Sequence, residues 1–123
     1  MLLINMGEIW LHQSGGEQQA KMLYKQGLHL WQDIQGEDDG IGIVKGLAGL
    51  AEVAAAQGQA ERAGRLFGAA VRLLPSASNY REDLNRHIAE ARSHLDETAF
   101  MTGWTAGQEM TEEQAVTDAL LEA

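Results

Sequence analysis

The chain contains no cysteine and only one proline among its 123 residues. The lack of cysteine excludes disulfide bonds, thiolate nucleophiles and zinc sites with thiolate ligands. The single proline, Pro75, leaves long segments in which a helix can run without interruption, because proline breaks helix interiors. No apolar run approaches the roughly 20 residues that a membrane-spanning helix needs. The apolar start of the chain, residues 1–4, lacks the basic segment that opens a secretory signal.

Basic residues are also scarce, since nine Lys and Arg stand against eighteen Asp and Glu, which gives a net charge of −9. The last basic residue is Arg92, so every charged side chain after it is acidic. Proteins bind nucleic acids through clustered Lys and Arg, and anionic surfaces repel acidic segments. We therefore expect neither a nucleic-acid partner nor a membrane partner for this chain.

The apolar residues that are present recur at steps of three and four, the spacing of one helix face. Tyr80, Leu84 and Ile88 form one such stripe, and no segment shows the sustained alternation that is typical of a strand. Glycine and proline breaks divide the chain into separate helices. The pattern predicts helices over residues 2–13, 17–35, 39–57, 60–74, 79–95, 97–108 and 112–122.

Polar residues at the starts of three of these segments predict helix caps. Ser78 or Asn79 is the expected cap at the start of the helix at 79–95, and Asp96 is the expected cap of the helix at 97–108. Thr111 is followed three residues later by Gln114, which is the spacing of a capping box. The last two helices are therefore expected to begin at these residues.

The chain repeats one pattern of residue types at an offset of 43 residues, the separation of Gly15 from Gly58. The pattern is glycine, alanine, an aromatic residue and a small residue. Glycine allows a tight turn, alanine allows close helix packing, and the aromatic ring fills the space between neighbouring hairpins. The matched pairs are Gly15 with Gly58, Ala20 with Ala63, Tyr24 with Phe67, and Gly27 with Ala70.

These residue types at these spacings resemble the tetratricopeptide repeat, although the standard period is about 34 residues. The stretch "GLAGLAEVAAAQGQAERAGRLFGAAVRL" (46–73) and the segment 80–116 further resemble the C-terminal repeat region of large bacterial signalling ATPases and of LuxR-type and AfsR-type transcriptional regulators. The resemblance covers nearly the whole chain. It implies one all-α domain of stacked antiparallel hairpins, with repeat hairpins at 1–36 and 37–75 and C-terminal cap helices at 76–123.

The same resemblance implies a cytoplasmic module for protein–protein interaction or structural coupling, in a longer protein whose ATPase module lies elsewhere. It implies no enzymatic activity and no cofactor in this segment. The partner would be a protein, either another domain of the same regulator or a peptide. The groove positions that the repeat family uses correspond to Asn5, Ile9, His12, Gln13, Lys45, Ala48, Glu52, Ala55 and Ala56.

The alternative is a small helical enzyme or metal-binding domain that uses His87, Glu90 and His94. These residues share one helix face, and imidazole and carboxylate groups can hold a metal. Their spacing is not that of the HExxH motif, and they flank an apolar stripe, where polar side chains usually meet solvent. We therefore expect a solvated border with no metal. No pair of carboxylates, and no serine or threonine together with a histidine, offers a catalytic triad in the sequence, so we expect no catalytic residue.

Two further features concern packing. Small residues lie along one side of two predicted helices and indicate a seam where helix backbones approach closely. They are Gly42, Gly46 and Gly49 in the helix at 39–57, and Ala60, Gly64 and Gly68 in the helix at 60–74. The first predicted helix, 2–13, is more apolar than one buried face requires. An exposed apolar patch of this kind is typical of an interface, so we expect a homodimer through this helix.

Overall fold

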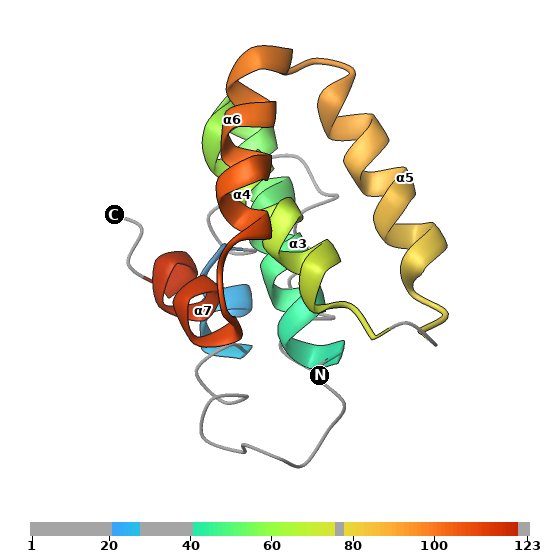
Figure 1. Ribbon diagram of the computed structural model, residues 1–123, viewed down its shortest axis with the longest axis vertical. Coiled ribbons are helices and arrows are strands. Elements are labelled where there is room, and N and C mark those ends of the chain that lie inside the picture. The colour runs from blue at the N-terminus through green and yellow to red at the C-terminus, as the bar shows by residue number, and fades with distance from the viewer. Residues whose placement is uncertain (1–20, 28–40, 76–77, 121–123) are drawn as a thin grey trace.

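The computed structural model describes residues 21–27, 41–75 and 78–120 of the chain (Figure 1). Residues 21–27 are helical, and none of the described residues lies in a strand, which confirms the predicted all-α class. The predicted helix 2–13 lies outside the described residues. The helices in the other described ranges are α3 (Ile41–Ala56), α4 (Ala60–Leu73), α5 (Arg81–Arg92), α6 (Glu97–Gln108) and α7 (Glu112–Leu120).

The α3 and α4 helices form an antiparallel hairpin around a turn at Gly58, as the sequence predicts. Gly58 has a φ of 77°, in the left-handed region that glycine adopts without a steric penalty. The amide of Gly58 donates to the carbonyl of Ala55 at 3.1 Å, and the amide of Gln59 donates to that of Ala54 at 2.9 Å. These two bonds satisfy carbonyls that the end of α3 would otherwise leave unpaired.

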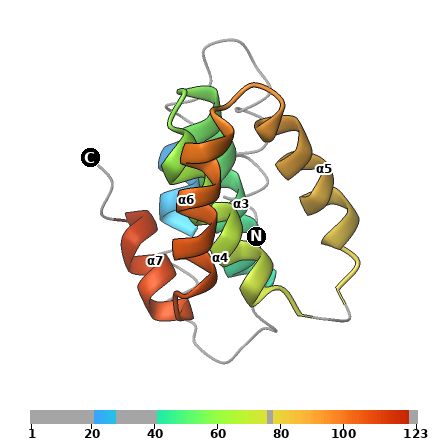
Figure 2. The same ribbon diagram turned by 45° about the horizontal axis from the view of Figure 1, so that its top comes forward.

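Among the described helices, the closest pair is α4 with α6, which lie side by side in both ribbon views (Figures 1 and 2). A Cβ atom on Gly64 would come within 3.0 Å of the backbone of Phe100, and one on Gly68 within 3.0 Å of the backbone of Trp104. The contacts advance together along both helices, so α4 and α6 run in the same direction. The seam predicted at Gly64 and Gly68 is therefore confirmed, and its partner helix is α6.

The α6 side of this seam also consists of glycine. A Cβ atom on Gly103 would collide with the carbonyl of Glu61, and one on Gly107 with that of Arg65. Gly49, which the sequence also suggested for a seam, has a different neighbour, because its missing side chain leaves room for the ring of Tyr24. The α3 helix at this position thus packs against an aromatic side chain and not against a helix backbone.

The core lies between these helices and is aromatic at its centre. Tyr24, Phe67 and Phe100 are fully buried, together with Leu47, Leu66 and Leu84. The rings of Phe67 and Phe100 are 6.4 Å apart, and the ring of Trp104 is stacked 6.1 Å from that of Phe100. Tyr24 and Phe67, which the 43-residue pattern pairs, are therefore both core residues.

The last two helices begin with the caps that the sequence predicts. Asp96 accepts a hydrogen bond from the amide of Ala99 at 2.8 Å. In the capping box, the amide of Gln114 donates to the hydroxyl of Thr111 at 3.1 Å, and the amide of Thr111 donates to the side chain of Gln114 at 3.0 Å. Arg65 then holds α7 against α4 through a 2.8 Å bond to Asp118.

The α5 helix differs from the prediction at both ends, because it begins at Arg81 and ends at Arg92. The predicted cap is wrong, since the hydroxyl of Ser78 accepts from the amide of Tyr80 in the turn before the helix. The α5 helix stands apart from α6 in both ribbon views and contacts α3 and α4 (Figures 1 and 2). Across the described ranges no helix is long and apolar enough to cross a bilayer.

Candidate functional site

A groove of about 160 Å³ separates part of α5 from α3. Alanine side chains from both helices leave this space open, because a single methyl group cannot bridge the gap between helices that stand apart. A carboxylate from each helix and two imidazoles from α5 surround the alanines. We call this feature the α3–α5 groove, and its lining residues are Glu52, Ala55, Ala56, His87, Glu90, Ala91 and His94.

The most buried polar contact in the groove joins the two helices. His87 Nδ1 lies 3.4 Å from Glu52 Oε2, and the two side chains are 18% and 16% exposed. Such a contact is within ion-pair range but longer than an ordinary hydrogen bond. The expectation that His87 belongs to a solvated border is therefore wrong. His87 is three residues beyond the buried Leu84 and four before the buried Ala91, so its side chain points toward α3.

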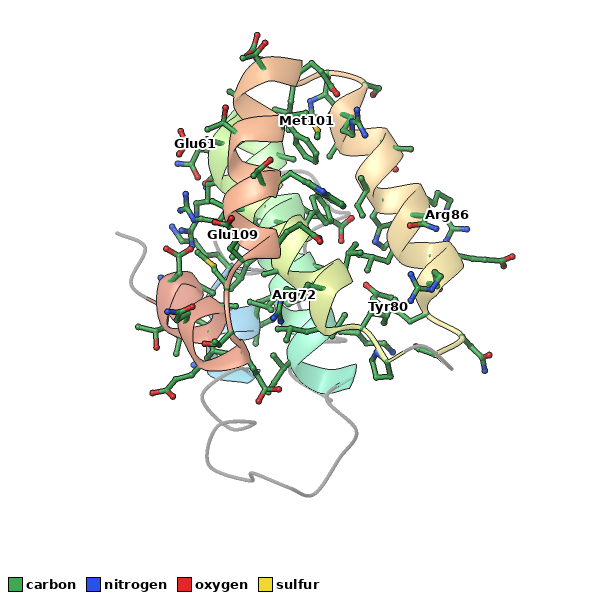
Figure 3. All side chains as sticks on the ribbon, viewed as in Figure 1. Glu61, Arg72, Tyr80, Arg86, Met101 and Glu109 are labelled. Atoms are coloured by element: carbon green, nitrogen blue, oxygen red, sulfur yellow. The ribbon has the colours of Figure 1, made fainter. Side chains whose placement is uncertain are left out.

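The other polar residues of α5 are more accessible to solvent. Glu90 and His94 are exposed where they line the groove. On the outer side of α5, Arg86 and Asp83 form an exposed pair at 2.8 Å, and Arg86 projects away from the α4–α6 pair (Figure 3). The α5 helix thus presents one polar edge to the groove and another to open solvent.

The three residues of the metal-binding alternative do line one groove, but they do not converge on a point. Within the described part of the chain, no group of three or more His, Cys, Asp or Glu side chains is arranged to hold a metal ion. A stable site normally needs three or four convergent ligands. The geometry of His87, Glu90 and His94 therefore gives the metal-binding alternative no support.

The groove positions implied by the resemblance fall into three groups. Glu52, Ala55 and Ala56 line the α3–α5 groove. Ala48 is fully buried in the core, and Lys45 lies 5.3 Å above the ring of Tyr80. The remaining positions lie outside the described residues and are Asn5, Ile9, His12 and Gln13.

Sequence reasoning assigned His87, Glu90 and His94 to a separate candidate site and missed that this face of α5 forms one groove with α3. His87 and Ala91 come from a helix that the resemblance assigned to a cap, and Glu52 is 35 positions before His87 in the chain. The available signal was the position of His87 at the edge of the Leu84–Ala91 apolar stripe. That position indicates partial burial of His87 but does not identify the helix that His87 contacts.

A second hollow, of about 770 Å³, lies between the end of α6 and α7. Its acidic lining includes Glu109, Glu113 and Asp118, beside the half-buried Met110. Asp118 is held by Arg65, and the two glutamates are exposed. The interhelical pair beside this hollow, Arg65 with Asp118, is more exposed than the pair of His87 with Glu52, so we take the α3–α5 groove as the stronger candidate site.

Comparisons of the chain with models of protein families, with curated proteins and with solved structures found no match. The resemblance to bacterial repeat-containing regulators therefore rests on the residues quoted above.

Proposed function

We propose that this chain is a protein-interaction module that receives a basic segment of a protein partner in its α3–α5 groove. The observation that carries the proposal is the groove itself, with carboxylates of Glu52 and Glu90 around a lining that includes Ala55 and Ala91. Alanines leave space for the methylene stem of Lys or Arg, and the carboxylates attract its charged head. The net charge of −9 favours encounter with a basic partner over an acidic one.

The wider architecture supports the same proposal. Stacked helical hairpins with alanine and glycine at close contacts are typical of tetratricopeptide repeats, which present extended binding surfaces. We propose a short superhelix of this kind, in which the α3–α4 hairpin is one repeat unit. Three of the positions that repeat proteins use for binding, Glu52, Ala55 and Ala56, line the groove. In a bacterial signalling or transcriptional regulator, such a module would couple this segment to another domain.

A titration of the full chain with a short peptide that alternates lysine and alanine tests the proposal. We expect the amide signals of Glu52, Ala55 and Ala91 to shift, and Glu90→Lys to weaken binding by roughly fivefold or more through charge repulsion. The matched control is Glu113→Lys, which makes the same charge change on α7, outside the groove. The proposal fails if the shifts fall only on α6 and α7, or if both variants weaken binding equally.

A further inference from the structure

The α7 helix is held by helices other than the one that precedes it in the chain. It contacts α3 and α4 more extensively than α6, and its buried residues are Ala115, Val116 and Ala119. The hollow of about 770 Å³ separates part of α7 from the end of α6. The docking surface of α7 therefore belongs to α3 and α4, whereas α6 supplies the covalent connection.

Two arginines of α4 bind the C-terminal end of α7. Arg65 Nε donates to Asp118 Oδ2 at 2.8 Å, and the two side chains are 22% and 30% exposed. Arg62 donates to the carbonyl of Ala119 at 3.2 Å, where the negative end of the helix dipole favours a cation. Charge-assisted hydrogen bonds add geometric specificity, so these two contacts select the position at which α7 docks.

The α7 helix is also a self-contained unit. Its capping box joins Thr111 and Gln114, so the helix keeps its cap wherever it docks. A helix of nine residues is marginal in water without tertiary packing, so α7 needs a docking surface. Only Glu109 and Met110 lie between the end of α6 and the capping box.

We propose that α7 is exchangeable between two copies of this chain, so that the surface on α3 and α4 also takes the α7 helix of a second copy. The second copy fits because its α7 carries the same small buried side chains, the same Asp118 and the same carbonyl at Ala119. Each exchanged contact replaces an identical internal contact, and only the connection at 109–110 takes a new path. The inference does not rest on the proposed function, because no residue of α7 lines the α3–α5 groove.

In the wild type, internal docking has the advantage of proximity. A short connection gives α7 an effective concentration on the order of 1 mM at its own surface. Two copies that each carry a net charge of −9 also repel each other. The wild type should therefore be a monomer well below this concentration, and exchange should dominate where the internal contact is made unfavourable.

Complementary charge changes in the full chain test the exchange. Arg65→Asp brings two carboxylates together at the α4–α7 contact, and Asp118→Arg brings two guanidinium groups together there, so each variant repels its own α7. If a mixture of the two variants exchanges α7, both contacts join opposite charges. Sedimentation velocity should then show at least about tenfold more dimer in the equimolar mixture than in either variant alone. Native mass spectrometry should find one copy of each variant in this dimer.

The matched control uses the exposed pair of Asp83 and Arg86. Asp83→Arg and Arg86→Asp give the same net charges as the two test variants. Both partners of this pair lie in α5, three residues apart, so an exchange of α7 cannot bring opposite charges together. A mixture of the two control variants should therefore remain monomeric.

Three results would overturn the exchange. The first is a mixture of Arg65→Asp and Asp118→Arg that stays monomeric while circular dichroism shows both variants folded. The second is an equal amount of dimer in the test and control mixtures, which would reflect the altered charges and not α7. The third is a dimer that forms equally in each variant alone, because it would use another surface, such as the predicted helix at 2–13.

If either variant fails to fold, the wild type decides. Amide signals of the isotope-labelled chain are compared at low concentration and at about 1 mM, where exchange competes with internal docking. The amide of Met110, in the connection, should shift with concentration, while that of Leu84 in α5 should not. A Met110 signal that stays unchanged up to this concentration would contradict the exchange of α7.

Discussion

At the scale of single residues, two glycines of this molecule are required for different physical reasons, one conformational and one steric. A Cβ atom on Gly58 would meet nothing within 4 Å, so only its positive φ demands glycine. Gly103 lies within an ordinary helix, but a Cβ atom there would collide with the backbone carbonyl of Glu61. A backbone atom cannot rotate away as a side chain does, so α4 and α6 would have to separate.

We therefore expect Gly103→Ala to destabilise the protein by about 2–3 kcal/mol, an overpacking cost that exceeds the gain of about 1 kcal/mol in helix propensity. Gly58→Ala should cost about 1–2 kcal/mol through backbone strain alone. Denaturant unfolding of both variants measures the difference. The control is Thr105→Ala, on the exposed face of the same helix, which should be close to neutral. A Gly103→Ala variant as stable as the wild type would contradict the close backbone packing.

At the scale of elements, local signals determine where helices begin, whereas contacts between helices depend on distant residues. The Thr111–Gln114 capping box is complete within four residues, so the sequence could predict it. We expect Thr111→Ala to cost about 1 kcal/mol and to increase amide exchange in the first turn of α7. Thr117→Ala is the control, because it makes the same change at an exposed position inside α7. Equal effects of the two changes would show that the cap contributes nothing.

The sequence predicted which face of α4 packs closely against another helix, but not which helix it packs against. The small residues Gly64 and Gly68 identified the face of α4 that packs closely, because such a run of glycine has little other use inside a helix. They did not identify α6 as the partner, since any helix with small residues along one face could pack against them. For the same reason the meeting of Glu52 with His87 could not be predicted: each residue is ordinary in its own helix, and only the tertiary packing brings the two together.

At the scale of the whole molecule, the excess of negative charge is the dominant electrostatic feature. The net charge of −9 means that the folded chain repels itself, and a compact state concentrates this repulsion. Glu109 adds to it at the C-terminal end of α6, where the helix dipole also disfavours a negative side chain. Exposed pairs such as Arg86 with Asp83 leave this excess unchanged, because each pair contains one charge of either sign, and solvent screening keeps their own contribution to stability small.

Added salt should therefore stabilise the protein. Salt shortens the screening length from about 30 Å at 0.01 M to about 3 Å at 1 M, and the long-range repulsion among many acidic groups is lost before the short contacts of paired ones. We expect the Tm to rise as sodium chloride increases over this range.

Glu109→Lys removes one negative charge and adds one positive charge, so the net charge changes from −9 to −7. This variant should have a higher Tm than the wild type at low salt and a smaller rise with salt. Glu109→Gln, with a net charge of −8, should fall between them. A Tm that decreases with salt in all three proteins would mean that ion pairs such as Arg65 with Asp118 outweigh the net repulsion.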